Sequence, residues 1–409
     1  MKLAETKVLR DPIHGYIHID QKVIWDLIDS KEFQRLRRIH QLGGVSMVYH
    51  CAEHTRFAHG LGVYELARRM MSEVDEIAQF LNHQQKMAGL CAALLHDLGH
   101  GPFSHCFERF SHIHHETLTK AIILDPHSEV HQILNKEDPS LAQRVVDILN
   151  HQSDCPLLEE MISSQLDCDR MDYLLRDAYM TGTTYGNFDL ERILRVLRVK
   201  EGHLCVKRSG THAVEDYIMA RYQMYWQVYL HPDAAGYESM ILTFLQAFKD
   251  YCDKHPSDLL QCKIVDLHQD VLNLQAFERL DDFSLLMQIE KAQDLEDEVL
   301  SNLSRAILSR RLPDWKSCQN KEEGEQWIAH LKLSHPFQQA LCQVMRMEAG
   351  EYRPYFESLH NPIRILDGDT CIPLSQCSDV TQALLNMKNP QQWRVYFPKE
   401  RFLKYEKTA

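Results

Sequence analysis

The segment HDLGHGPFSH at residues 96–105 constrains this chain more than any other. An apolar run over residues 87–95 predicts a helix that ends by presenting His96 and Asp97 side by side. Two glycines and a proline follow within residues 99–102, and these residue types do not extend a regular helix comfortably. Because a neutral imidazole nitrogen and an anionic carboxylate oxygen together suit a divalent cation, we expect a metal site here.

A single His–Asp pair leaves a divalent ion half satisfied, so further ligands must come from elsewhere in the chain. His59 stands near the start of a long helical pattern, and three aspartates at residues 167–172 stand near the start of another. Such a mixed set leaves positions for water or phosphate, as a catalytic metal requires. The competing interpretation is that Asp167 or Asp169 is a helix N-cap and that His59 is a core histidine. The candidate ligands at this point are two histidines, His59 and His96, with Asp97 and one of the three later aspartates.

Composition limits the classes of function. The net charge of −13 argues against broad binding to nucleic acid, which needs a basic surface. The 12 cysteines include no CxxC pair, so we expect free thiols rather than a ribbon-type zinc site. With no signal-peptide pattern and no apolar run long enough for a bilayer, we expect a cytoplasmic protein without a membrane span.

Hydrophobic periodicity predicts a mainly α fold. Residues 7–20 alternate around a Pro/Gly turn and predict a hairpin, and residues 196–206 predict a second one. Helical patterns cover residues 23–28, 33–39, 59–81, 85–98, 103–110, 116–124, 141–149, 157–166, 169–179, 211–230, 234–251, 283–289, 295–309 and 322–331. Strand patterns at residues 363–366, 371–374 and 393–397 predict a smaller α/β C-terminal lobe. We therefore expect N-terminal elements at 1–50, a helical core at 51–260 and the lobe at 261–409.

Several motifs, in this order, carry a resemblance to a known family. They are DPIHG at 11–15, FQRLR at 33–37, QLGG at 41–44, HTRFAH at 54–59, HDLGHGPFSH at 96–105 and DRMDY at 169–173. The chain resembles the HD superfamily of metal-dependent phosphohydrolases, and among them the deoxynucleoside triphosphate triphosphohydrolases, including the vertebrate enzyme with SAM and HD domains. The resemblance covers about the first 240 residues, and we expect no SAM domain before Lys7. It implies an HD-domain helical core.

The resemblance implies a reaction and its catalytic groups. One divalent ion (iron, manganese, zinc, nickel or magnesium) would be bound by His59, His96, Asp97 and Asp169, with magnesium on the nucleotide phosphates. Attack at the α-phosphorus would release a deoxynucleoside and intact triphosphate. His100 and His115 would contact the α-phosphate, one of them protonating the leaving 5′-oxygen, since the histidine pKa lies near neutrality. Glu108 would orient a catalytic histidine.

The resemblance also assigns substrate contacts. Phosphates would be neutralised by arginine, whose planar guanidinium matches them. The alternative for each arginine is that it lies on a solvated helix face and binds no phosphate. Tyr229 would crowd the 2′ position of the sugar and so favour deoxy substrates. Arg170 replaces a family lysine, and Tyr225 and Leu230 replace a histidine and a glutamine, which leaves base preference open. The implied substrate residues are Gln41, Leu42, Arg56, His105, Arg170, Tyr173, Asp177, Arg221, Tyr225 and Tyr229.

A regulatory site is implied as well. The family binds GTP or dGTP and dNTP effectors between subunits, and a homotetramer is expected. The implied effector residues are Lys7, Val8, Asp29, Gln34, Arg37, Arg192 and Lys207. The alternative is that Asp29 and Ser30 only cap the helix at Phe33. Two rival functions remain: hydrolysis of a nucleoside monophosphate or cyclic nucleotide, and a nucleotide-sensing or single-strand nucleic-acid binding protein.

Overall fold

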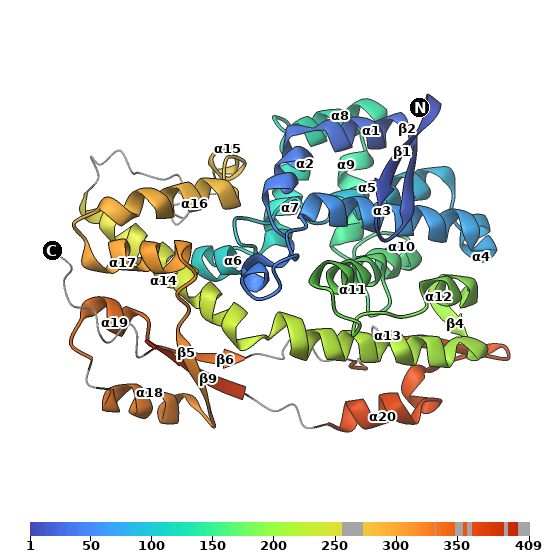
Figure 1. Ribbon diagram of the computed structural model, residues 1–409. Coiled ribbons are helices and arrows are strands. Elements are labelled where there is room, and N and C mark those ends of the chain that lie inside the picture. Colours follow the sequence, from blue (N-terminus) through green and yellow to red (C-terminus); the bar gives the residue numbers. More distant parts are fainter. Residues whose placement is uncertain (256–272, 332, 348–354, 358–361, 388–391, 400–409) are drawn as a thin grey trace.

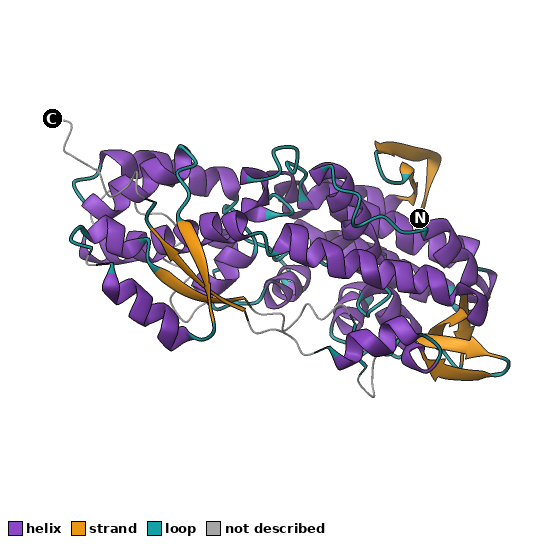
Figure 2. Ribbon diagram, turned by 60° about the horizontal axis from the view of Figure 1, so that its bottom comes forward, coloured by secondary structure: helices purple, strands orange, loops and turns teal. Residues whose placement is uncertain are grey.

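The structure, a computed structural model, describes residues 1–255, 273–331, 333–347, 355–357, 362–387 and 392–399. The described chain is mainly helical with a few small sheets, which confirms the predicted fold class (Figures 1 and 2). The first hairpin, β1 (Lys2–Asp11) and β2 (Gly15–Gln21), forms where alternation predicted it.

Three helices form the centre of the core. α3 (Arg56–Glu73) packs against both α5 (His83–Leu95) and α11 (Cys168–Thr181). A capping box of Asn82 and Gln85 starts α5, and residues 87–95 are all buried. A helix that is apolar all round is buried on all sides, so its C-terminal end delivers His96 and Asp97 into the interior.

Shorter helices surround this centre. They are α1 (Lys22–Asp29), α2 (Lys31–Arg35), α4 (Asp75–Phe80), α6 (His105–Ser111), α7 (His115–Leu124), α8 (Glu129–Glu137), α9 (Leu141–Leu149), α10 (Pro156–Ile162) and α12 (Leu190–Val196). The single helix expected over residues 59–81 is two helices, because Val74 adopts an extended conformation (φ −96°, ψ 102°) between α3 and α4. α8 was not predicted; it buries only Val130 and Leu134.

A long helical path joins the core to the C-terminal region. α13 (Thr211–Met224) continues into a π-helical segment, Tyr225–Tyr229, and α14 (Pro232–Lys254) begins directly after it. Figure 1 shows α13 along the lower side of the core and α14 leading to the C-terminal helices. These are α15 (Leu274–Phe277), α16 (Asp282–Lys291), α17 (Glu298–Leu308), α18 (Lys321–His330), α19 (Pro336–Ala340) and α20 (Asp379–Asn386).

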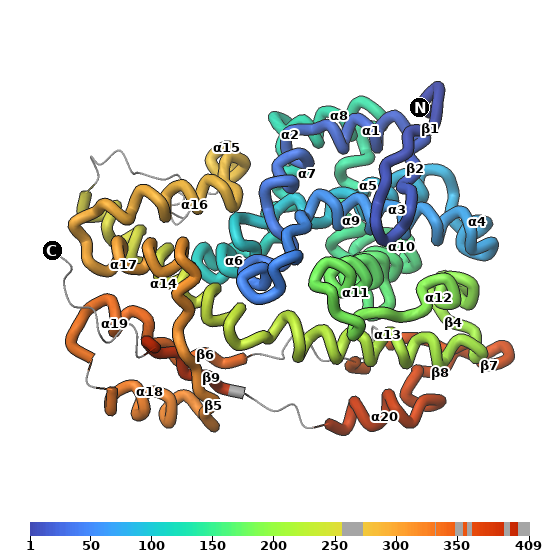
Figure 3. Tube along the Cα trace, in the orientation of Figure 1, coloured from blue at the N-terminus to red at the C-terminus, as the bar shows by residue number. Residues whose placement is uncertain are grey.

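The C-terminal strands belong to two different sheets. One sheet has the order β3–β4–β7–β8, comprising β3 (Leu197–Lys200), β4 (His203–Lys207), β7 (Arg364–Asp367) and β8 (Thr370–Pro373), with β4 and β7 parallel. The other has the order β5–β9–β6, comprising β5 (Asp314–Cys318), β9 (Gln392–Phe397) and β6 (Gln343–Met347). After β5 and β6 the chain therefore returns to the core, where β7 and β8 join β3 and β4, and it then goes back to pair β9 with β5 and β6 (Figure 3). β5 and β6 were not predicted, and the expected boundary at 260/261 lies outside the described residues.

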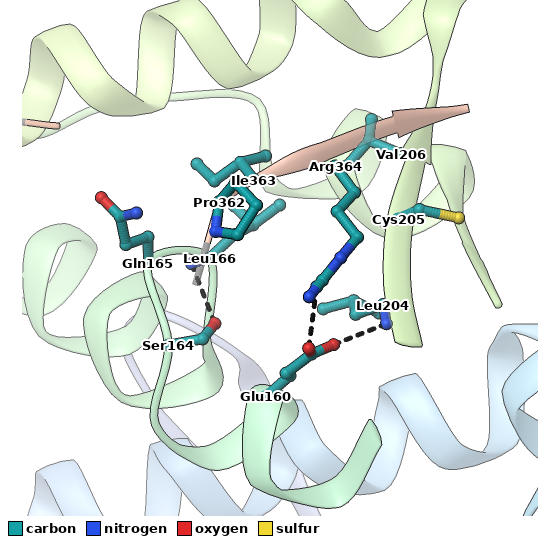
Figure 4. A pocket seen from close by; sticks show the side chains of 10 residues that line it. All are labelled: Glu160, Ser164, Gln165, Leu166, Leu204, Cys205, Val206, Pro362, Ile363 and Arg364. Atoms are coloured by element: carbon teal, nitrogen blue, oxygen red, sulfur yellow. Dashed lines mark hydrogen bonds and ion pairs between the residues drawn. The ribbon is translucent and has the colours of Figure 1, made fainter. Parts of the chain in front are cut away.

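A small cavity marks the junction of β4 and β7 (Figure 4). Glu160 on α10 accepts hydrogen bonds from Arg364 Nη1 and from the Leu204 backbone nitrogen, both at 2.7 Å. One carboxylate thus ties α10 to both strands. The cavity is lined by none of the predicted metal ligands. None of the helices in the described ranges combines the length and the apolar character of a membrane span.

Candidate active site

The four predicted metal ligands converge from three helices. His59 on α3 lies with Nε2 3.0 Å from Oδ1 of Asp169 in the first turn of α11. His96, directly after α5, has Nε2 3.7 Å from the same oxygen. Asp97 completes the group, with its carboxylate oxygens 3.4 Å from His96 Nε2 and 3.9 Å from His59 Nε2. Ligand atoms of His59, His96 and Asp169 lie within 4.8 Å of one another, and Asp97 borders this group while also grouping with His100 and His115. We call His59, His96, Asp97 and Asp169 the metal half.

The chemistry of these donors fits a divalent metal. Nδ1 of His59 faces Asp172 at 2.8 Å, and Nδ1 of His96 faces the Ala93 carbonyl oxygen at 3.0 Å. Those outer contacts direct both Nε2 atoms toward the carboxylates, an arrangement typical of histidine ligands. His96 Nε2 is buried and has no hydrogen-bond partner within the described part of the chain, as a nitrogen that binds a metal would.

Both carboxylates of the metal half are held as anions. Burial opposes the ionisation of Asp97, but Arg56 and His96 outweigh it and hold its pKa well below the usual range. For Asp169, burial is outweighed by the hydrogen bond with His59 and by the nearby His96 imidazole, so its pKa is also lowered. The helix N-cap is Asp167 and not Asp169, because the Asp167 side chain accepts from the Arg170 backbone nitrogen at 2.7 Å.

The predicted catalytic residues lie directly beside the metal half. His100 Nε2 is 3.3 Å from Asp97, and the rings of His100 and His115 stack with centroids 3.8 Å apart. Glu108 on α6 contacts Nδ1 of His115, accepts from its backbone nitrogen at 2.9 Å and lies 3.1 Å from Nδ1 of His105. This catalytic half (His100, His115 and Glu108) therefore shares Asp97 with the metal half.

Electrostatics give the two stacked histidines different surroundings. Burial, Arg56 and His115 together hold the pKa of His100 well below its ordinary value, so its imidazole is neutral. Burial opposes ionisation of Glu108, but hydrogen bonds from His105 and His115 outweigh it and lower its pKa. The Glu108 carboxylate at Nδ1 fixes the orientation of the His115 ring, as a general acid requires.

The glycines of the HD segment serve close packing. A Cβ at Gly99 would lie 2.0 Å from the His115 carbonyl oxygen, and one at Gly101 would lie 2.3 Å from the ring of Phe107. The expected break after α5 is present, since the helix ends at Leu95. The two glycines also allow the close approach of α6 and α7, which brings His115 to His100.

The predicted phosphate-binding arginines have different environments. Arg56 is buried, with Nη1 2.5 Å from Asp97 and Nε 2.9 Å from Oγ of Ser104. Arg170 instead directs Nε to the Ser164 carbonyl oxygen at 2.6 Å and to Asp167 at 3.1 Å. Arg221 is buried on α13 and acts electrostatically on Tyr173. Arg56 is thus the arginine in direct contact with the metal half.

The predicted sugar-reading residues form a connected group. The Tyr229 hydroxyl donates to Asp177 at 2.8 Å, and His54 Nε2 lies 2.7 Å from the other oxygen of that carboxylate. Tyr173 stands between this group and the metal half, with ring centroids 6.1 Å from Tyr229 and 6.4 Å from His59. Gln41 directs a buried Oε1 that has no hydrogen-bond partner in the described ranges. Leu42 is half-buried and Tyr225 is buried.

The predicted effector residues fall into two groups. Lys7 and Val8 lie on β1 and Asp29 ends α1, while Arg37 donates to Gln34 at 2.8 Å and stacks over the Phe57 ring at 3.5 Å. Arg192 on α12 and Lys207 on β4 form the second group, away from α1 and α2 in Figure 1. The N-cap of α2 is Ser30, whose hydroxyl accepts from the Phe33 nitrogen at 3.4 Å, so the capping alternative applies to Ser30 and not to Asp29.

Several polar residues to which the sequence assigned no role touch the site. Asp172 contacts His59, and His14 at the hairpin turn contacts Asp172 at 2.7 Å. His54 holds Asp177, and Ser104 holds Arg56. His14, His54 and Asp172 stand inside the motifs DPIHG, HTRFAH and DRMDY, so the signal was present, but a motif does not say which member touches which.

Family models match most of the chain. Residues 56–177 match the HD domain, and residues 188–409 match the HD associated region. The chain belongs to the HD-domain family. HD domains bind a divalent metal through His and Asp residues, which agrees with the metal half of this HD-domain protein.

Relatives support a phosphohydrolase. The protein YwfO of Bacillus subtilis is 40% identical over 98% of this chain and 94% of its own length. The zebrafish deoxynucleoside triphosphate triphosphohydrolase SAMHD1 is 31% identical over 59% of this chain and 45% of that protein. A crystal structure of a phosphohydrolase from Bacteroides thetaiotaomicron superposes with a TM-score of 0.82 at 28% identity, covering 96% of this chain and 100% of that one. This HD-domain protein is therefore a hydrolase of the HD phosphohydrolase family.

Proposed function

We propose that this HD-domain protein hydrolyses deoxynucleoside triphosphates to deoxynucleosides and inorganic triphosphate. The main support is the position of Asp97, which lies 3.4 Å from His96 Nε2 in the metal half and 3.3 Å from His100 Nε2 in the catalytic half. A metal and an acid–base pair on the two sides of one carboxylate suit attack on a phosphorus with simultaneous protonation of its leaving oxygen. The zebrafish relative named for this reaction supports the substrate class.

The metal half would hold one divalent ion through His59, His96, Asp97 and Asp169. Iron, manganese, zinc, nickel and magnesium all accept this donor set, and magnesium would accompany the nucleotide phosphates. When bound, such an ion lowers the pKa of a water ligand and polarises a phosphoryl oxygen. His115 has Nδ1 against Glu108, which leaves Nε2 as the atom that passes a proton to the leaving 5′-oxygen.

Substrate recognition follows from the surrounding side chains. Arg56 and Arg221 are buried cations near the two halves and would neutralise phosphates, with Arg170 and His105 further out. Asp177, joined to Tyr229, would accept a hydrogen bond from the sugar 3′-hydroxyl. Gln41, whose Oε1 has no hydrogen-bond partner within the described ranges, would accept one from the same sugar. Tyr229 would occupy the space that a 2′-hydroxyl needs, which favours deoxy substrates.

Product analysis tests this proposal. The metal-loaded protein is incubated with dGTP and magnesium, and the products are separated by anion-exchange chromatography. Deoxyguanosine and triphosphate in equal amounts support the proposal. Pyrophosphate, orthophosphate or no turnover would refute it, and parallel incubations with dGMP and a cyclic nucleotide would then reveal one of the rival phosphohydrolase activities. Tight nucleotide binding without turnover would indicate a sensor.

Regulation forms the second part of the proposal. We infer that GTP or dGTP, together with a dNTP, binds at an interface of a cytoplasmic homotetramer. The support is the family resemblance, which assigns effector contacts to residues on β1, α1 and α12. Lys7 would hold effector phosphates and Asp29 would accept from a guanine edge. Light scattering and turnover are measured with and without GTP, for the wild type and for Lys7→Ala. GTP should promote tetramers and turnover in the wild type and in the control variant Lys22→Ala, which changes a lysine on α1, but not in Lys7→Ala. A response of Lys7→Ala equal to that of the wild type would refute this assignment.

A further inference from the structure

The loop that carries His100 has an unusual backbone. Phe103 and Ser104 adopt φ of 53° and 49° in succession, the left-handed region that side chains other than glycine rarely enter. Each such residue costs about 1–3 kcal/mol unless the surroundings hold it. These two residues separate His100 from His105 and α6, so what fixes them also fixes the direction in which His100 points.

A buried carboxylate from a distant part of the chain holds this loop. Asp282 opens α16 within the HD-associated region and is 0% exposed. One of its oxygens accepts from the Phe103 backbone nitrogen at 2.8 Å. The other accepts from the His40 backbone nitrogen at 2.8 Å and lies 2.6 Å from Nδ1 of the same residue. Both oxygens are therefore used as acceptors, which only a carboxylate can supply.

The other end of the loop is tied to the same region. The buried Arg35 donates from Nη2 to the carbonyl oxygens of Leu98 at 2.9 Å and His100 at 2.8 Å. Its Nη1 donates to the Leu280 carbonyl oxygen at 2.9 Å, and its guanidinium stacks over the Phe277 ring at 4.5 Å. Residues 98–104 are thus held at both ends by contacts that lead to residues 277–282.

We infer that Asp282 is a positioning residue for His100, and that the HD-associated region thereby completes the active site. Its carboxylate keeps Phe103 and Ser104 at their positive φ angles, and the loop then presents His100 to Asp97 and to the His115 ring. The catalytic consequence rests on the proposed function, whereas the loop contact itself does not. If one of the two acceptor oxygens of Asp282 is removed, residues 98–104 should lose their fixed conformation while the predicted metal ligands stay unchanged.

The neighbouring aspartate provides a matched control. Asp281 is the N-cap of α16, accepts from the Ser284 nitrogen at 2.8 Å and pairs with Arg38 at 2.5 Å. Asparagine caps a helix as well as aspartate does. Asp281→Asn and Asp282→Asn therefore make the same chemical change at adjacent positions. Only Asp282→Asn affects the loop, because its amide has a single acceptor oxygen for the two backbone nitrogens of Phe103 and His40.

Kinetics on the metal-loaded enzyme give the first test. For Asp282→Asn we expect kcat with dGTP to fall about 10- to 100-fold, because a displaced catalytic group loses its alignment. KM and bound metal should match the wild type, a division that general unfolding would not produce. Asp281→Asn should match the wild type in all three. Equal kcat for the two variants would overturn the inference.

Amide hydrogen exchange gives a second test that needs no turnover. In the wild type the Phe103 amide should be protected as strongly as helical amides of α5, although it lies in a loop. In Asp282→Asn it should exchange at least about 10-fold faster, and in Asp281→Asn it should not change. Fast exchange in the wild type would overturn the inference even if Asp282→Asn did not fold. If the wild type lacks dNTP hydrolysis, the proposed function fails and exchange alone decides about Asp282.

Discussion

The Asp172 carboxylate lies between two histidines, 2.8 Å from Nδ1 of His59 and 2.7 Å from Nε2 of His14. Burial opposes its ionisation, but Arg176 and the two histidines outweigh it and hold the pKa of Asp172 well below the usual range. A Cβ at Gly62 would lie 1.9 Å from this carboxylate, so α3 makes room for it. The turn of the N-terminal hairpin is thereby connected to His59, one of the predicted metal ligands.

Replacing Asp172 should weaken metal binding. An asparagine in its place no longer supplies an anion at Nδ1 of His59, and loss of such a partner lowers metal affinity by about 10- to 100-fold. The measurement is a titration of apo-protein with Mn²⁺. Asp177→Asn is the matched control, because Asp177 is equally buried on α11 but holds His54 and Tyr229; it should raise KM and leave metal affinity unchanged. Equal metal affinity in the two variants would contradict this role.

Substitutions in the metal half should remove both bound metal and turnover, whereas substitutions in the catalytic half should remove turnover alone. Asp169→Asn should lose both, because it removes an anionic ligand, whereas His100→Ala should keep the metal and lose turnover. Asp167→Asn, at the N-cap two residues before Asp169, should keep both. Elemental analysis and dGTP turnover on the same preparations give the comparison. Metal loss in His100→Ala would mean that the two halves are not distinct.

Stability should depend on pH through His40. Its hydrogen bond to Asp282 raises the pKa of His40 above the ordinary 6.5, against the effect of burial and with help from Glu53. Because the folded-state pKa is the higher one, this contact stabilises the protein fully below pH 6.5 and is lost as the pH rises through the folded-state value. Thermal melts between about pH 6 and about pH 9 should show a larger fall in Tm for the wild type than for His40→Gln. An equal fall in Tm with pH for the wild type and His40→Gln would rule out this contribution. The control variant His127→Gln should show the same fall in Tm as the wild type.

Tyr229 should determine sugar selectivity. Tyr229→Ala empties the space beside Asp177 and should lower the preference for dGTP over GTP, measured as the ratio of kcat/KM values, by about 10-fold. Tyr179→Ala, on the exposed face of α11, should leave that ratio unchanged. A ratio unchanged in Tyr229→Ala would assign the exclusion of the 2′-hydroxyl to other residues.

Much of the fold could be predicted, because the signals were local. The apolar run before His96 predicted α5, and the Pro/Gly turn predicted the first hairpin. What could not be predicted depends on partners distant in sequence. The strands β7 and β9 were predicted, but the pairing of β7 with β4 across more than half of the HD-associated region was not. β6, which pairs with β9, was not predicted, because a weakly patterned strand acquires its conformation from the neighbour it pairs with.

The candidate site divides in the same way. His59, His96, Asp97 and Asp169 could be named from residue type and motif, and the structure brings them together. The contacts of Asp172 and Asp282 could not be named, because burial and hydrogen-bond partners decide them. For Arg170 the motif suggested a phosphate contact, whereas its side chain is held by Asp167 and Ser164 in this structure.

The origin of the new oxygen atom in the products tests the central claim most directly. Water that attacks the α-phosphorus ends in triphosphate, whereas attack at the 5′-carbon ends in the nucleoside. The metal-loaded protein is incubated with dGTP in water enriched in oxygen-18, and both products are analysed by mass spectrometry. The proposed reaction predicts that triphosphate gains a single labelled oxygen and that deoxyguanosine gains none. Label in deoxyguanosine, or in pyrophosphate or orthophosphate as the first product, would contradict it.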